Sequence, residues 1–134
     1  MQTFLPYADF DLSAKSLDYK RLGKQRIEAR QIYQIISENR TEGGWVNHPA
    51  VKMWKQYPDA LASYYDAVVL EWIRRGYRNS MTLLRAPIPE DYPPFIGNMD
   101  FHNSHRSNLL RKDFEYYSQF AWDIPDNLPC IWPV

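Results

Sequence analysis

Cationic side chains gather between Lys20 and Arg26, at the expected start of a helix. Lys20, Lys24 and Glu28 follow one another in steps of four, so one helical face carries two ammonium groups and one carboxylate. The free amide donors of a helix N-terminus and the positive side chains both favour an anion such as phosphate. We therefore predict that this segment, including Arg21, borders a site for a phosphodiester ligand.

Glu28 is the only carboxylate on that face. A carboxylate among cations can act as a general acid or base. It can equally serve as the structural partner of Lys24, and both interpretations remain open from the sequence.

A second basic cluster lies between His102 and Lys112, a run that contains no acidic residue. On a helix, His102, His105 and Arg106 share one face. We expect these side chains and Lys112 to contact phosphate groups. Zinc needs at least a third protein ligand beside two histidines, and we predict neither a metal nor another cofactor.

The segment Asn47-His48-Pro49 precedes a short helix expected over 50–55, since proline suits a first helical position. His48 is a candidate for ligand contact or proton transfer, with Asn47 as a neighbouring contact to DNA. Alternatively, Asn47 caps the helix and His48 only fills space. Trp45 and Trp54 either belong to the core or flank an unstacked base.

The composition of the chain limits its class. A length of 134 residues with 45% apolar residues fits one domain, residues 1–134. The 16 basic and 16 acidic residues give a formal charge of zero, so DNA binding requires charge segregation. Segregation is present: six cations face two acids between Lys15 and Arg30, whereas the segment from Asp113 to Val134 has four acids and no cation.

The single cysteine, Cys130, excludes an internal disulfide framework and is compatible with a reducing compartment. There is no long apolar run and no signal-peptide pattern. We expect a cytoplasmic monomer without membrane contact.

The hydrophobic pattern predicts an all-α fold with an extended N-terminal arm. After a short turn near 11–13, a long helix is expected over 16–39, with Ser16 as its cap. Residues 41–44 form a break, and Pro58 starts a helix that ends before Gly76. Its apolar stripe is expected in the core: Leu61, Tyr64, Tyr65, Val68 and Trp72.

The last third of the chain is rich in proline. Four prolines between 86 and 94 exclude regular structure there. A helix is expected over 100–112, resuming through 113–120. A proline-rich tail follows, which we expect to be held to the body by Trp122, Ile131 and Trp132.

Two stretches of the sequence resemble the pyrimidine-dimer DNA glycosylases, the phage endonuclease V class with its bacterial and phage branch. Asp18-Tyr19-Lys20-Arg21-Leu22-Gly23-Lys24 is similar to the family's helix start, tyrosine-basic-x-leucine-x-basic. Val46-Asn47-His48-Pro49 is similar to its histidine turn, and Glu71-Trp72-Ile73-Arg74-Arg75-Gly76-Tyr77 to the end of its following helix. The run from His105 to Asp113 resembles a motif of the bacterial and phage branch.

This resemblance implies a helical protein that binds duplex DNA, kinks it and extrudes a base. The family uses an N-terminal α-amine as nucleophile, which forms a Schiff base with the sugar before strand scission. An α-amine has a pKa of about 8, so it is deprotonated near neutrality more often than a lysine side chain. By resemblance, the nucleophile position is the amine of Met1, and removal of the initiator would transfer that role to Gln2.

One position departs from the family pattern. The family's catalytic glutamate aligns with Arg21, and a cation cannot stabilise a cationic intermediate as a carboxylate does. The family's second helix cation aligns with Lys24, which matches. Either Glu28 replaces the missing carboxylate, or this branch performs different chemistry.

We therefore expect a base-excision DNA glycosylase with abasic-site lyase activity on damaged or modified pyrimidines, with Met1, Glu28 and His48 as catalytic residues. One alternative is a non-catalytic nucleic-acid-binding protein of the same fold. Another is an enzyme that acts on a nucleotide or modified base.

Overall fold

The computed structural model describes all residues from Met1 to Val134 and contains helices but no strand. The helices are α1 (Phe10–Ser16), α2 (Tyr19–Ser37), α3 (Pro49–Trp54), α4 (Pro58–Arg74), α5 (Met99–Lys112) and α6 (Phe114–Tyr117), followed by a 3₁₀ turn, Ser118–Phe120. The predicted all-α class is confirmed. The break at 41–44 and the absence of regular structure over 86–94 are confirmed as well.

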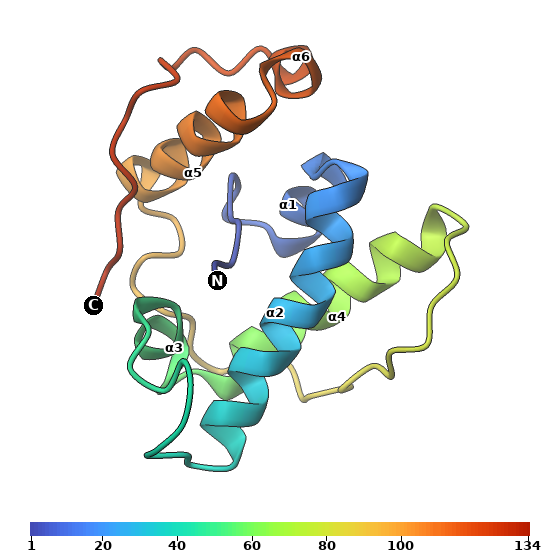
Figure 1. The fold of residues 1–134 in the computed structure, drawn as a ribbon, viewed down its shortest axis with the longest axis vertical. Coiled ribbons are helices and arrows are strands. Elements are labelled where there is room, and N and C mark those ends of the chain that lie inside the picture. Colours follow the sequence, from blue (N-terminus) through green and yellow to red (C-terminus); the bar gives the residue numbers. More distant parts are fainter.

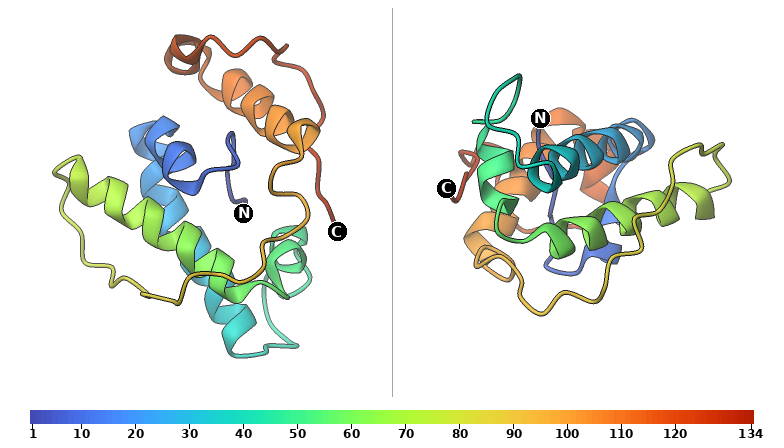
Figure 2. Two further views of the ribbon diagram at one scale, coloured as in Figure 1. Left: turned by 180° about the vertical axis from the view of Figure 1, so that it is seen from behind. Right: turned by 90° about the horizontal axis from the view of Figure 1, so that it is seen from below.

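The helices form two groups with the N-terminal arm between them. In Figure 1, α2 crosses α4 with α1 beside them, while α5 and α6 lie on the other side of the arm. The segment between α4 and α5 runs around the outside of the molecule, as both views in Figure 2 show. Residues far apart in the sequence therefore meet around the first residues of the chain.

The crossing of α2 and α4 is closely packed at Gly23. A Cβ atom at this position would lie 3.0 Å from the Trp72 ring, so the glycine allows the two helices to approach. The predicted apolar stripe of α4 is buried throughout, from Leu61 to Trp72. Gly23 thus allows α2 and α4 to pack closely in the core.

The predicted turn near 11–13 and the helix start at Ser16 are wrong. Asp9 caps α1 by accepting a hydrogen bond from the Leu12 amide at 2.9 Å, and α1 ends at Ser16. The chain is then extended at Leu17 and Asp18, and α2 begins at Tyr19. Arg75, the residue that follows α4, contacts the chain at this break.

Arg75 holds the joint between α1 and α2. Its guanidinium donates to the Leu17 carbonyl at 2.8 Å and to the Lys15 carbonyl at 3.0 Å, which satisfies acceptors at the end of α1. The buried carboxylate of Glu71 accepts from Arg75 at 2.7 Å and fixes the guanidinium. Glu71 and Arg75 of the Glu71–Tyr77 motif therefore have a structural role at the joint between α1 and α2.

The tail from 121 to 134 has no regular structure and runs along α5 towards α3 (Figures 1 and 2). Ser107 accepts from the Leu128 amide at 2.9 Å and Ser104 from the Ile131 amide at 3.3 Å. Trp122 and Trp132 pack against the core as expected, but Ile131 is exposed and Ile124 packs instead.

One cluster of 26 buried residues extends from Phe4 in the arm to Tyr117 in α6. It joins the two helical groups through the arm. No helix of the structure combines the length and apolar character needed to cross a lipid bilayer.

Candidate active site

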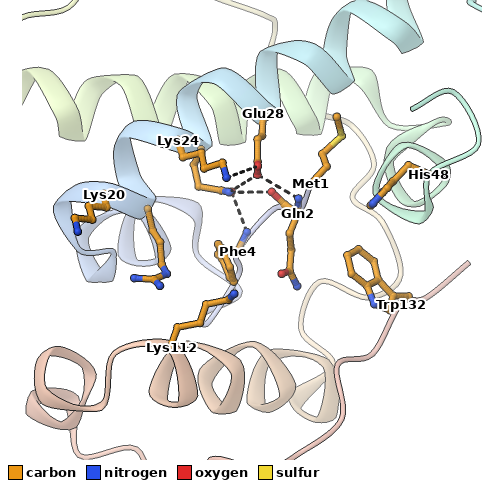
Figure 3. Close-up of a pocket in the computed structure, with 11 residues that line it drawn as sticks. Met1, Gln2, Phe4, Lys20, Lys24, Glu28, His48, Lys112 and Trp132 are labelled. Atoms are coloured by element: carbon orange, nitrogen blue, oxygen red, sulfur yellow. Dashed lines mark hydrogen bonds and ion pairs between the residues drawn. The ribbon is translucent and has the colours of Figure 1, made fainter. Parts of the chain in front are cut away.

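A cleft of about 510 Å³ opens where the arm, α2, α3, α5 and the tail meet. Figure 3 shows side chains from these five segments surrounding it. The lining residues are Met1, Gln2, Phe4, Lys20, Arg21, Lys24, Gln25, Glu28, His48, Lys112 and Trp132. The structure thus brings together all three predicted catalytic residues and four of the eight predicted DNA contacts.

Gln25 of α2 organises the floor of the cleft although its side chain is almost fully buried. Its Oε1 accepts from the Phe4 amide at 3.0 Å and from the Tyr64 hydroxyl at 2.7 Å. Its Nε2 donates to the Gln2 carbonyl at 2.9 Å and to Oε2 of Glu28 at 3.1 Å. All hydrogen-bonding positions of this amide are used, so the arm and Glu28 are fixed relative to each other.

Glu28 faces the first peptide of the chain. Its Oε2 accepts from the Gln2 backbone amide at 3.2 Å, while Oε1 lies 4.0 Å from Nζ of Lys24. Because the side chain of Lys24 is 74% exposed, this ion pair adds little stability. Glu28 is therefore held mainly by its hydrogen bonds from Gln25 and from the Gln2 amide, and the second of these lies next to Met1.

Two histidines of α5 hold the arm in place at Leu5. Nδ1 of His105 accepts from the Leu5 amide at 2.8 Å, and Nδ1 of His102 donates to the Leu5 carbonyl at 2.8 Å. His102 also accepts from the Gly97 amide through Nε2 at 2.9 Å, so its neutral form is the Nδ1–H tautomer. Burial and the neighbouring His102 lower the pKa of His105 from 6.5 to about 3.

These contacts correct the expectation that His102 and His105 face phosphate. Both side chains are buried, at 0% and 1% exposure. Their ring nitrogens form the hydrogen bonds that the backbone of the arm would otherwise make with a neighbouring strand. Arg106 is also occupied, since its Nε donates to the Pro6 carbonyl at 2.7 Å and its guanidinium lies over the Tyr7 ring. Only Lys112, at the end of this predicted cluster, reaches the cleft.

His48 caps α3 and presents its other nitrogen to the cleft. Nδ1 accepts from the Ala50 amide at 3.0 Å, so the interpretation that Asn47 caps this helix is wrong. The neutral ring then carries its proton on Nε2 and is a hydrogen-bond donor. Burial and the positive N-terminus lower the pKa of His48, against the opposing effect of Glu28. Asn47 is exposed and does not line the cleft.

Lys20, Arg21, Lys24 and Lys112 supply positive charge around the opening (Figure 3 labels the three lysines). Arg21 donates to Asp18 at 3.2 Å, and the Tyr117 hydroxyl also binds that carboxylate. Arg21 is therefore oriented and partly neutralised, whereas Lys20 and Lys24 are exposed.

No group of three or more His, Cys, Asp or Glu side chains is arranged to hold a metal ion. The ionisable and amide groups that line the cleft are amines, one guanidinium, amides, one imidazole and one carboxylate. This set suits acid–base and nucleophilic chemistry on an anionic ligand.

Sequence reasoning missed Gln25 and the role of Trp132 in the cleft. Gln25 lies between Leu22 and Ala29 on the buried face of α2, so a polar residue inside an apolar stripe was the available signal. For Trp132 no such signal exists, because the path of an irregular tail is set by tertiary contacts.

The sequence model of the pyrimidine dimer DNA glycosylase family matches residues 1–84. This match covers more than half of the chain. The chain belongs to this family. No curated protein and no solved structure matches it.

Membership places the chain among DNA glycosylases of DNA repair, which agrees with the resemblance found in its motifs. The matched region contains the arm, α2, α3 and α4, and with them Met1, Glu28 and His48. Lys112 and Trp132, which complete the cleft, come from residues beyond the matched region.

Proposed function

We propose that this glycosylase family member excises damaged or modified pyrimidines from duplex DNA and then cleaves the strand at the abasic site. The observation that carries the proposal is the contact of Glu28 with the Gln2 amide, next to Met1, inside a cationic cleft that His48 also lines. A nucleophile, a carboxylate and a neutral donor thus line the same opening.

In the proposed reaction, Glu28 takes a proton from the α-ammonium of Met1, and the amine lone pair attacks C1′ of the sugar. The N–C1′ bond forms as the glycosidic bond breaks, and the base leaves with the bond's electron pair and takes the proton held by Glu28. The C1′–O4′ bond then breaks as a proton passes from the nitrogen to O4′, and the ring-opened sugar carries an iminium group whose positive charge is stabilised by the Glu28 carboxylate. Glu28 removes a proton from C2′, and β-elimination breaks the C3′–O bond, releases the phosphate attached there and leaves a conjugated iminium for hydrolysis.

The remaining cleft residues are proposed to bind the DNA. Lys20, Lys24 and Lys112 neutralise phosphates on both sides of the opening, and Arg21 adds a guanidinium oriented by Asp18. His48 donates from Nε2 to an oxygen of the substrate. Glu28 thereby replaces the glutamate that the family pattern has at the position of Arg21.

We also propose that residues 1–134 act as one domain and as a monomer. The support is the continuous core, together with the two histidines of α5 that hold the arm of the matched region. The cleft has walls from both halves of the chain.

Reduction with borohydride tests the proposed chemistry directly. Incubation with an abasic-site duplex and borohydride should give a covalent adduct, because the iminium is reduced to a stable amine. Mass spectrometry of the digested adduct should place the DNA remnant on the peptide that carries the α-amine. The same analysis determines whether Met1 is retained.

Glu28→Gln is the informative variant, and Glu38→Gln, on an exposed residue at the end of the same helix, is its matched control. Adduct formation should fall by several orders of magnitude in the first and stay unchanged in the second. Acetylation of the α-amine should also abolish the adduct. An adduct that survives acetylation would overturn the assignment of the nucleophile.

A non-catalytic DNA-binding role is the second candidate, favoured by the position of Arg21 where the family pattern has glutamate. In that case DNA binding depends on salt through phosphate contacts, but no adduct forms with any abasic substrate. Binding without an adduct would therefore favour this candidate over the first.

A further inference from the structure

Trp45 is a large aromatic side chain that lies outside the core and contacts a residue of the cleft. It is 54% exposed, whereas Trp54, nine positions later, is fully buried and donates from Nε1 to Thr3. Its φ is +73°, in the left-handed region that bulky residues rarely adopt. Because the indole is exposed, its packing contributes little free energy to offset the strain of this backbone. Backbone strain of this kind concentrates at functional sites.

The turn that holds Trp45 is tied to the cleft through His48. The Trp45 carbonyl accepts from the His48 amide at 2.9 Å, and the Trp45 and His48 rings meet edge to face with centroids 5.4 Å apart. The Trp132 ring also meets the His48 ring edge to face, with centroids 5.6 Å apart. His48 and Trp132 border the cleft in Figure 3, so Trp45 contacts a residue of the cleft wall without lining the cleft itself.

We propose that Trp45 stacks with a nucleobase that has left the base stack, next to the nucleotide whose sugar enters the cleft. This proposal rests on the proposed function, because it places the DNA backbone on Lys20, Lys24 and Lys112. An enzyme that reacts at C1′ must extrude a nucleotide from the duplex, which leaves a base without its stacking partner. An exposed indole face gives that base a new stacking partner, whichever of the four bases it is.

The contact makes Trp45 a positioning residue, since it does not touch the reacting atoms. Stacking lowers the free energy of the extruded state and so favours DNA that already contains an unpaired base. Fully paired DNA, bound through phosphates alone, gains nothing from the indole.

The test compares the affinities of two unreactive duplexes, one fully paired and one with a single unpaired nucleotide, by fluorescence anisotropy. The variant is Trp45→Asn, because asparagine tolerates positive φ and removes the ring without adding strain. Trp45→Tyr restores an aromatic face. Phe114→Ala removes another exposed aromatic ring, 63% exposed on α6, at the opposite end of the molecule from the turn (Figure 1).

Trp45→Asn should weaken binding to the duplex with the unpaired nucleotide by roughly 5- to 150-fold, the range of one base–aromatic stack. Affinity for the paired duplex should not change, Trp45→Tyr should recover most of the loss, and Phe114→Ala should have no effect. Equal loss on both duplexes, or no loss on either, would overturn the proposal. These measurements need no catalysis, so failure of the borohydride adduct is distinguishable from failure of the stacking contact.

Discussion

Acidification should release the arm by protonating His105. In the folded protein, burial and the neighbouring His102 lower the pKa of His105 from 6.5 to about 3. A proton on Nδ1 would also remove the acceptor of the Leu5 amide. In the unfolded chain the imidazole regains its ordinary pKa. The stabilising contribution is therefore complete above about pH 6.5 and declines as the pH falls towards about 3.

The magnitude follows from linkage. Below the pKa that His105 has in the unfolded chain, each pH unit removes about 1.4 kcal/mol from the free energy of unfolding. Between about pH 7 and pH 5, His105 alone should remove roughly 2 kcal/mol. His102, whose pKa is lowered mainly by burial, adds to the loss in the same direction.

Urea denaturation at a series of pH values measures this slope. His105→Asn places a non-titrating acceptor near the Leu5 amide, so its curve should be flatter than the wild-type curve by roughly 2 kcal/mol over that range. As an independent measurement, the ring-proton NMR signal of His105 in the folded protein should not shift between about pH 8 and pH 5. Parallel slopes, or a His105 signal that titrates near pH 6.5, would refute the reasoning.

Three further outcomes are expected. Lys20→Ala with Lys24→Ala should reduce the slope of log K against log salt by about two, and an unchanged slope would remove this helix from the interface. Gly23→Ala should lower the free energy of unfolding by roughly 1–2 kcal/mol, because the added Cβ meets the Trp72 ring. Urea denaturation measures this change, and a stabilised variant would contradict it. Gln25→Leu should lower the rate of adduct formation more than it lowers DNA affinity, because it removes the hydrogen bonds that hold Glu28 and the arm. Equal losses of rate and affinity would contradict a positioning role.

Much of the helical framework was predictable from local signals. The apolar stripe from Leu61 to Trp72, the glycine pair at 43–44 and the prolines over 86–94 each determine structure through their own backbone and periodicity. The joint between α1 and α2 was not predictable, because Arg75 stabilises it from more than 50 positions away.

The candidate site was predictable only in part. The spacing of Lys20, Lys24 and Glu28 placed them on one helical face, and the structure has all three at the cleft. His102 and His105 share a face as predicted, but that face is turned inward, towards Leu5. Periodicity shows which residues share a face, and it cannot show whether solvent or another segment covers that face.

The sequence by itself determined most of the helices, the segregated charges and the family, because these depend on residue type and on separations of a few positions. The tertiary structure decided which groups meet. Met1, Glu28, His48 and Lys112 converge because two buried histidines and one buried glutamine hold an extended arm that has no secondary structure of its own. The path of such a segment is determined by where the rest of the fold places hydrogen-bond partners for its amide and carbonyl groups.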